Sequence, residues 1–235
     1  MTKSANRVES VERALSVLDA FKQGKPTLTL AEIATRTGLY KSTILRLIGS
    51  LEHCGYIARS ADGTYHLGIS VFQLGLLFKR SFDVEGIIRP TLQTLVDSTR
   101  ETAAYYVRVG DQRLCLYREN SPRSARHHLE EGSLLPISFG ATGHILRIFD
   151  RSAERSAWEQ QIYEQGYYIS LGERDPDVGS VAVPVLDGAG SVYGALSVSG
   201  LMSRYVEEKR LLAVVHLKAE ARKLSHMLQK HHADI

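Results

Sequence analysis

The sequence contains little cysteine and no long apolar run. Cys54 and Cys115 are its only two cysteines, so a disulfide framework or a thiolate metal site is poorly supported. No stretch of about 18 uncharged apolar residues occurs, and the opening segment MTKSANRVES lacks the apolar core of a secretory signal. We therefore expect a cytoplasmic protein with no membrane partner and no bound metal.

Recognised catalytic motifs are also missing. The sequence has no GxSxG elbow, HExxH helix, phosphate-binding loop or CxxC pair. The pairs His127-His128 and His231-His232 do not have the spacing of metal ligands. We expect no catalytic residues and no cofactor, although a site assembled from distant residues would escape such a search.

Composition and charge indicate two dissimilar domains. A chain of 235 residues with 43% hydrophobic content can bury a sizeable core. Residues 1–80 carry 11 Lys and Arg against 6 Asp and Glu, whereas residues 81–235 carry 18 against 20. A basic module thus precedes a nearly neutral one, as expected when the first part meets a polyanion.

The basic module begins with two helical patterns. Apolar residues recur at helical spacing over 10–22, and Gly24 ends that pattern. Thr29 is placed to cap a second helix, with Glu32 three residues later completing a capping box. Gly38 is placed as the left-handed residue that ends this helix.

A third helix follows almost at once, and its two sides differ. Its core stripe consists of Ile44, Leu47, Ile48 and Leu51. The opposite side is small, polar and basic, and comprises Ser42, Arg46, Gly49 and His53, flanked by Lys41, Thr43 and Leu45. Two helices joined by a short glycine-containing turn, the second with such a face, are typical of a helix-turn-helix whose second helix enters the DNA major groove.

A hairpin completes this module. In GYIARSADGTYHLG two short β-type runs flank Ala61, Asp62 and Gly63, and Asp-Gly is a strong hairpin signal. The sequence therefore predicts a winged helix-turn-helix over 1–67, in which Arg46 pairs with a guanine edge or a phosphate. The residues expected to contact DNA are Thr29, Lys41, Ser42, Thr43, Arg46 and Arg59.

Other interpretations of this module stay open. The helices can be half of a small helical domain with solvated basic residues, or a winged helix can bind protein in place of DNA. The module can also be an appendage on an enzyme that acts on a small metabolite. DNA binding is favoured because the capping box, glycine turn, basic face and wing occur in the right order within about 40 residues.

Several stretches together resemble the IclR family of bacterial transcriptional regulators. They are VESVERALSVLDAF, TLAEIATRTGLYKSTILRLIGSLEHCGYI, YHLGISVFQLG, LPISFGATGHIL and GERDPDVGSVAVPVLDGAGSVYGALSVSG. The resemblance implies a regulator, expected to be a repressor, that binds a pseudo-palindromic operator as a dimer or dimer of dimers. It also implies a linker helix over 68–82 and a GAF-like effector-binding domain over 83–235.

The pattern of the second domain predicts an α+β fold with a mostly antiparallel sheet. Expected strands cover 103–109, 113–118, 178–186 and 192–199, with a further extended stretch over 124–129. Expected helices cover 84–99, 140–149, 152–165 and 203–230.

A candidate effector site lies in this domain. Gly140, Ala141 and Thr142 are expected at a helix N-terminus, where free backbone N–H groups favour a carboxylate. Ser197 and Ser199 share one strand face by period two, and Ser180 lies on the facing strand, so three hydroxyls can converge. The glycines of this segment, Gly140 and Gly143, can instead serve helix packing, and the serines can bond neighbouring backbone.

The resemblance supports the same site. Ala141, Thr142, Ser180, Ser197 and Ser199 align with positions that contact small acids in the family, which implies a small organic acid or aromatic effector. Further unranked candidates are Tyr105, Tyr106, Arg108, Tyr117, His128 and His144. At the position of His144 the family commonly has lysine, so a shared charge role is in doubt there.

Overall fold

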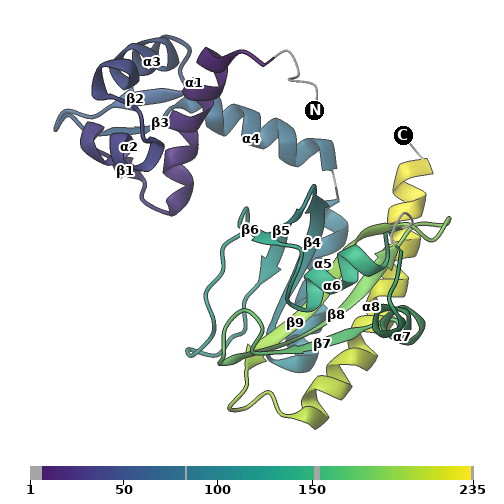
Figure 1. The fold of residues 1–235 in the computed structure, drawn as a ribbon. Coiled ribbons are helices and arrows are strands. Elements are labelled where there is room, and N and C mark those ends of the chain that lie inside the picture. Colours follow the sequence, from purple (N-terminus) through teal and green to yellow (C-terminus); the bar gives the residue numbers. More distant parts are fainter. Residues whose placement is uncertain (1–6, 83, 151–153, 234–235) are drawn as a thin grey trace. The chain divides into compact units, whose positions relative to one another are not determined.

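The computed structural model describes residues 7–82, 84–150 and 154–233 (Figure 1). The chain divides into two compact units, residues 1–83 and 84–235. The helix expected as a linker belongs by its contacts to the first unit. No helix among the described residues is long and apolar enough to cross a membrane.

The first unit is a helical cluster with a small antiparallel sheet. Its helices are α1 (Glu9–Asp19), continued by the 3₁₀ turn η1 (Ala20–Gln23), then α2 (Leu30–Thr37), α3 (Lys41–His53) and α4 (Ile69–Phe82). Its strands are β1 (Thr27–Leu28), β2 (Ile57–Arg59) and β3 (Tyr65–Leu67), in the order β1-β3-β2. The expected helix-turn-helix and wing are therefore present.

Local sequence signals explain the turn between α2 and α3. The Thr29 hydroxyl accepts a hydrogen bond from the Glu32 backbone N–H, and the Glu32 carboxylate accepts one from the Thr29 backbone N–H, so the capping box is confirmed. Gly38 ends α2 with φ of 70°, the left-handed conformation that glycine adopts at low cost. Val17, Leu28, Ile33 and Ile44, all fully buried, then fix the helices around one core.

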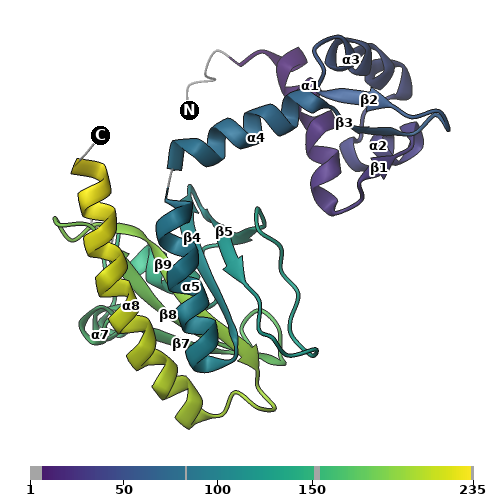
Figure 2. The ribbon, with the colours of Figure 1, turned by 180° about the vertical axis from the view of Figure 1, so that it is seen from behind.

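The second unit is built on a six-stranded antiparallel sheet in the order β6-β5-β4-β9-β8-β7. The strands are β4 (Thr102–Val109), β5 (Gln112–Glu119), β6 (Leu134–Pro136), β7 (Tyr168–Leu171), β8 (Val178–Leu186) and β9 (Val192–Leu201). The helices are α5 (Glu85–Thr99), α6 (Ala141–Ile148), α7 (Ala157–Gln165) and α8 (Glu207–Ala233). Helices α5 and α8 lie side by side on one face of the sheet, and α6 covers part of the other (Figures 1 and 2).

Strand alternation decides which side chains meet α6. Ala104, Tyr106, Ala182 and Ala195 pack with the apolar side of α6 in one buried cluster. Because side chains alternate along a strand, Ser180, Ser197 and Ser199 lie on this same face. The register pairs Ser180 directly with Ser199, and Ala182 with Ser197.

Four expectations about elements were wrong or incomplete. Residues 124–129 form no strand, and the edge strand beside β5 is β6, because the intervening chain turns away through bends before it pairs. The two short strands β1 and β7 were not expected.

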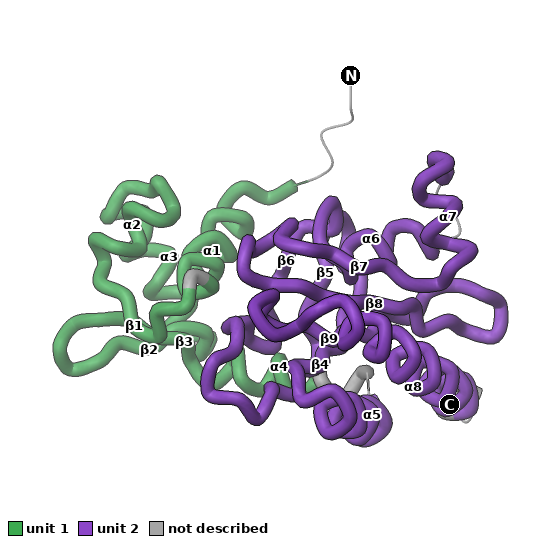
Figure 3. Tube along the Cα trace, turned by 90° about the horizontal axis from the view of Figure 1, so that it is seen from below, with its two compact units in different colours: residues 1–83 green, residues 84–235 purple. Residues whose placement is uncertain are grey.

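Helix α7 begins only after the Ser156 capping box, and residues 151–153 of that expected helix lie outside the described residues. Helix α8 starts at Glu207, later than expected, because residues 202–204 form turns. Figure 3 shows the two units in separate colours.

Candidate functional site

Helix α3 presents the polar face that the sequence predicts. Ile44, Ile48 and Leu51 are buried. Lys41, Ser42 and Arg46 are exposed, and Thr43 is half-buried. Within the described chain, Arg46 makes no hydrogen bond or ion pair, so its guanidinium is available to a ligand. Contact of these residues with DNA stays a prediction.

Gly49 lies on the same exposed face, in the interior of α3. Glycine there costs about 1 kcal/mol of helix stability relative to alanine. A Cβ added at Gly49 would meet no atom within 4 Å, so packing inside this chain does not require glycine. A small residue at this position suits a helix face against which another molecule lies closely.

Thr29 and Arg59 already have structural partners. The Thr29 hydroxyl also donates to the Glu32 carboxylate at 2.8 Å, which commits its one O–H donor to the cap of α2. Arg59 ends β2 in the wing, is exposed, and holds its guanidinium 5.7 Å from the centre of the Tyr65 ring. A phosphate contact is compatible with the position of Arg59, whereas Thr29 would offer a shared hydroxyl.

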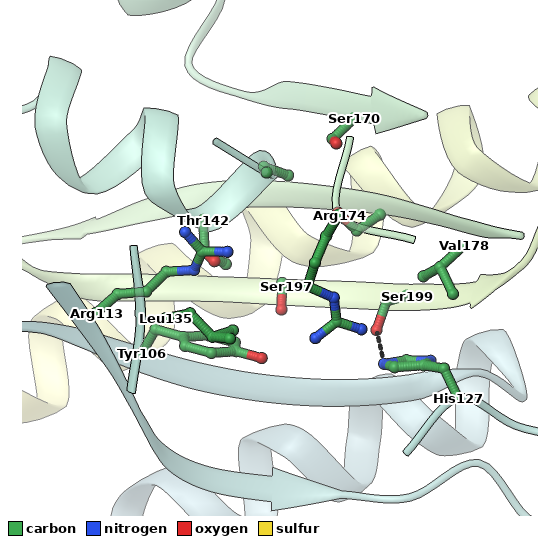
Figure 4. Close-up of a pocket in the computed structure, with 13 residues that line it drawn as sticks. Tyr106, Arg113, His127, Leu135, Thr142, Ser170, Arg174, Val178, Ser197 and Ser199 are labelled. Carbon is green, nitrogen blue, oxygen red and sulfur yellow. Dashed lines mark hydrogen bonds between the residues drawn. The ribbon is translucent and has the colours of Figure 1, made fainter. Parts of the chain in front are cut away.

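A cavity opens in the second unit between the N-terminus of α6 and the sheet face that α6 covers (Figure 4). Its volume is about 40 Å³, room for about three water molecules. All six residues expected to bind an effector line it: Gly140, Ala141, Thr142, Ser180, Ser197 and Ser199. The fold thus brings these side chains together, and binding of an effector by them stays a prediction.

Of the unranked candidates, only Tyr106 lines the cavity. Tyr105 precedes Tyr106 on β4 and points to the other sheet face, because side chains alternate along a strand. Arg108 is paired with Asp150 at 2.5 Å, and His128 is exposed. His144 is buried one turn along α6 from Gly140.

Arg113 is a cavity residue that the sequence analysis missed. It is only 3% exposed, and its guanidinium donates to the carbonyl oxygens of Pro136 and, at 2.6 Å, of Phe139. Its Nε is buried without a hydrogen-bond partner. Burial lowers the pKa of Arg113 to about 10, so the group is still charged at neutral pH. The uncommon feature is a buried cation that bonds carbonyls and no carboxylate.

His127 and Arg174 also line the cavity and come from loops. The His127 Nε2 lies 3.1 Å from Nη2 of Arg118 and 3.3 Å from Oγ of Ser199. Burial, followed by the charge of Arg118, lowers the pKa of His127 to about 4. The ring is therefore neutral at pH 7, and its Nε2 accepts from Arg118 while its Nδ1 is buried without a partner.

Glu173 modifies the expected helix N-terminus. Its carboxylate accepts hydrogen bonds from the Gly140 backbone N–H at 2.7 Å, from the Tyr168 hydroxyl at 2.9 Å and from the His144 ring at 3.0 Å. These bonds hold the pKa of Glu173 below its usual value against the opposing effect of burial. The N–H of Gly140, expected to be free for a ligand, is thus already occupied.

Among the described residues, no group of three or more His, Cys, Asp or Glu side chains is arranged to hold a metal ion. The fold is that of a winged helix-turn-helix DNA-binding module joined to an α+β unit that contains a polar cavity. This combination defines the class of two-domain transcriptional regulators.

Comparison with known proteins identifies the family. The models for the IclR helix-turn-helix domain and for the bacterial transcriptional regulator IclR C-terminal domain match residues 10–61 and 159–226. The Pca regulon regulatory protein of Pseudomonas putida is 30% identical, aligned over 93% of this chain and 84% of its own. The chain belongs to the IclR family of bacterial transcriptional regulators.

Solved structures have the same fold. The crystal structure of an IclR transcriptional regulator from Alicyclobacillus acidocaldarius gives a TM-score of 0.78 at 26% identity, over 94% of this chain and 98% of that one. An IclR homolog from Microbacterium hydrocarbonoxydans, solved in complex with 4-hydroxybenzoate, gives 0.75 at 20% identity, over 91% and 99%.

Proposed function

We propose that this regulator is a repressor that binds a two-fold related operator through α3 and responds to a small organic acid or aromatic effector in the cavity of the second unit. The exposed, unpaired Arg46 on the polar face of α3 is the observation that carries the DNA-binding part. Repression needs only occupancy of DNA that overlaps a promoter, so it demands no further contact surface.

Apolar surface on the first unit supports pairing of two copies, as a dimer or a dimer of dimers. Leu15 of α1 is 54% exposed, and Phe72 and Leu77 of α4 are 62% and 59% exposed. Side chains of α1, α3 and α4 also line an apolar groove of about 630 Å³. A second copy would bury such surface and place two recognition helices on related half-sites.

The cavity supports a response to an acid. Its hydroxyls, its two arginines and the N-terminus of α6 are groups that bind carboxylates. The homolog whose structure contains 4-hydroxybenzoate supports an aromatic acid as one member of this class. An effector that prefers one arrangement of the dimer changes the spacing of the recognition helices and thereby the operator affinity.

Binding to DNA from upstream of its own and neighbouring genes, at two salt concentrations, tests the DNA-binding part. We expect a steep loss of affinity with salt, because phosphate contacts release counterions. Arg46→Ala should weaken specific binding by roughly tenfold or more. Arg13→Ala is the matched control, since Arg13 is exposed on α1 and pairs only with Glu9 across the surface.

Equal binding by wild type and Arg46→Ala would contradict the assignment of α3 as the recognition helix. The effector part is tested separately by operator affinity with and without saturating 4-hydroxybenzoate and aliphatic acids. Unchanged affinity with every acid would contradict the proposed response while leaving DNA binding intact.

A further inference from the structure

The cavity carries an excess of positive charge. Arg113 and Arg174 line it together with His127, and its lining includes no aspartate or glutamate. Arg118, only 6% exposed, lies behind His127 and donates to that ring and to its backbone carbonyl. Three guanidinium groups therefore lie in or beside one small cavity.

Within the described residues, none of these three arginines is ion-paired with a carboxylate. Arg113 donates to two carbonyls, Arg118 donates to Asn120 and His127, and Arg174 makes no hydrogen bond to another residue that the structure describes. Atoms Nε of Arg113 and Nη1 of Arg118 are buried without a partner. Leaving buried cations unpaired is costly, so the arrangement indicates a site built for an anion.

Two neighbouring carboxylates, those of Glu173 and Glu131, already have other partners. Glu173 bonds the N-terminus of α6, His144 and Tyr168. Glu131 accepts from the backbone N–H of Arg118 and from Arg89, and so leaves the Arg118 guanidinium without a carboxylate. Neither carboxylate forms an ion pair with the three arginines.

The charge is divided between two ends of the cavity (Figure 4). Arg113 lies beside Thr142 at one end, near the N-terminus of α6. The Arg174 guanidinium reaches toward Ser197 and Ser199 farther along, with His127 beyond them. The two ends thus offer separate positions for carboxylates.

We propose that the effector is a dianionic organic acid, a dicarboxylate whose two carboxylates are held by Arg113 at the α6 end and by Arg174 with Ser199 at the other. This inference rests on the proposed function and narrows its effector class. Neutral His127 lies beside the position of the second carboxylate without adding charge. Arg174 is half-exposed and has no hydrogen-bond partner in the described part of the chain, so it can move to make room for a ligand larger than the present cavity.

Matched pairs of acids test the proposal on the full-length protein by calorimetric titration at constant ionic strength. The dicarboxylates are succinate, glutarate, adipate and terephthalate. Their partners are butyrate, pentanoate, hexanoate and 4-methylbenzoate, in each of which a methyl group replaces one carboxylate. We expect at least one dicarboxylate to bind roughly tenfold or more tightly than its partner, the effect of one charge-assisted contact.

Arg174→Gln should remove this discrimination. It should weaken the dicarboxylate by about tenfold and leave the monocarboxylate within about threefold, because only the second contact is lost. Arg222→Gln, on an exposed face of α8, removes the same net charge outside the cavity and should change neither. The Arg174 side chain makes no hydrogen bond or ion pair with any other described residue, so the variant isolates ligand binding.

Three results would overturn the proposal: a monocarboxylate that binds as tightly as its dicarboxylate, discrimination that survives Arg174→Gln, or no binding by any of the eight acids. A monocarboxylate that binds as tightly as its dicarboxylate and changes operator affinity would refute the dianion and uphold the effector response. A dicarboxylate that binds without changing operator affinity would do the reverse.

Discussion

Gly49→Ala should stabilise the first unit and weaken operator binding at the same time. Gly49 is exposed in the interior of α3, and an added Cβ meets no atom within 4 Å. The substitution therefore adds no clash inside this chain. It removes the backbone entropy that glycine loses on folding and places a methyl group on the face that also carries Arg46.

The size of the stabilisation follows from helix propensity. Alanine is better than glycine by about 0.8–1.0 kcal/mol in a helix interior, and no packing term opposes it here. For a unit of this size, about 1 kcal/mol raises the melting temperature by roughly 4–8 °C. Gly86→Ala is the matched control, because Gly86 is an exposed glycine of α5 in the second unit and an added Cβ there also meets no atom within 4 Å.

Scanning calorimetry of the full-length protein measures the first effect. The single tryptophan, Trp158, belongs to the second unit, so its fluorescence marks the other transition. Operator titration measures the second effect, and we expect affinity to fall for Gly49→Ala but not for Gly86→Ala. A melting temperature that does not rise would refute the reasoning about α3. A rise with unchanged operator affinity would remove Gly49 from the DNA-facing surface.

Three further changes test the capping box, the α6 contact and the histidine. Thr29→Ala should lower the stability of the first unit by about 1 kcal/mol, while Thr29→Ser should restore the cap, both measured by calorimetry. Gly143→Ala should lower the free energy of urea unfolding by about 1–3 kcal/mol and weaken acid binding, because the added Cβ would lie 2.5 Å from Nη1 of Arg113. Gly86→Ala is the control, because a Cβ added at Gly86 meets no atom within 4 Å and should have neither effect. His127 has a pKa of about 4 in the folded chain and an ordinary value of 6.5, so the unfolded chain binds more protons between these two pH values. The stability of the protein should therefore rise with pH across this window and fall on acidification. His127→Asn should flatten this pH profile.

Local signals explain what the sequence predicted well. The capping box at Thr29 and the glycine turn at Gly38 depend on residues within one helical turn, and they place α2 and α3 without help from the rest of the fold. The hairpin of the wing likewise depends on the four residues around Asp62. Such features can be read from a short window because their partners lie inside it.

Short edge strands could not be predicted in this way. Strand β1 has two residues and exists because Thr27 and Leu28 pair with β3, almost 40 positions later. Strand β7 pairs with β8 only, and β6 with β5 only. Hydrogen bonding to a distant strand decides these elements, and no periodicity within three or four residues records it.

The charge of the cavity shows the same limit most clearly. Counting residues predicts a nearly neutral second domain. Because Glu173 is adjacent to Arg174 in the sequence, its carboxylate would be expected to neutralise the Arg174 guanidinium. In the fold the two side chains diverge: the Glu173 carboxylate bonds the N-terminus of α6, while the Arg174 guanidinium enters the cavity beside Ser197 and Ser199. Arg113 joins it from β5. The charge in the cavity therefore depends on which groups each carboxylate accepts hydrogen bonds from. Those partners are determined only by the assembled sheet and loops.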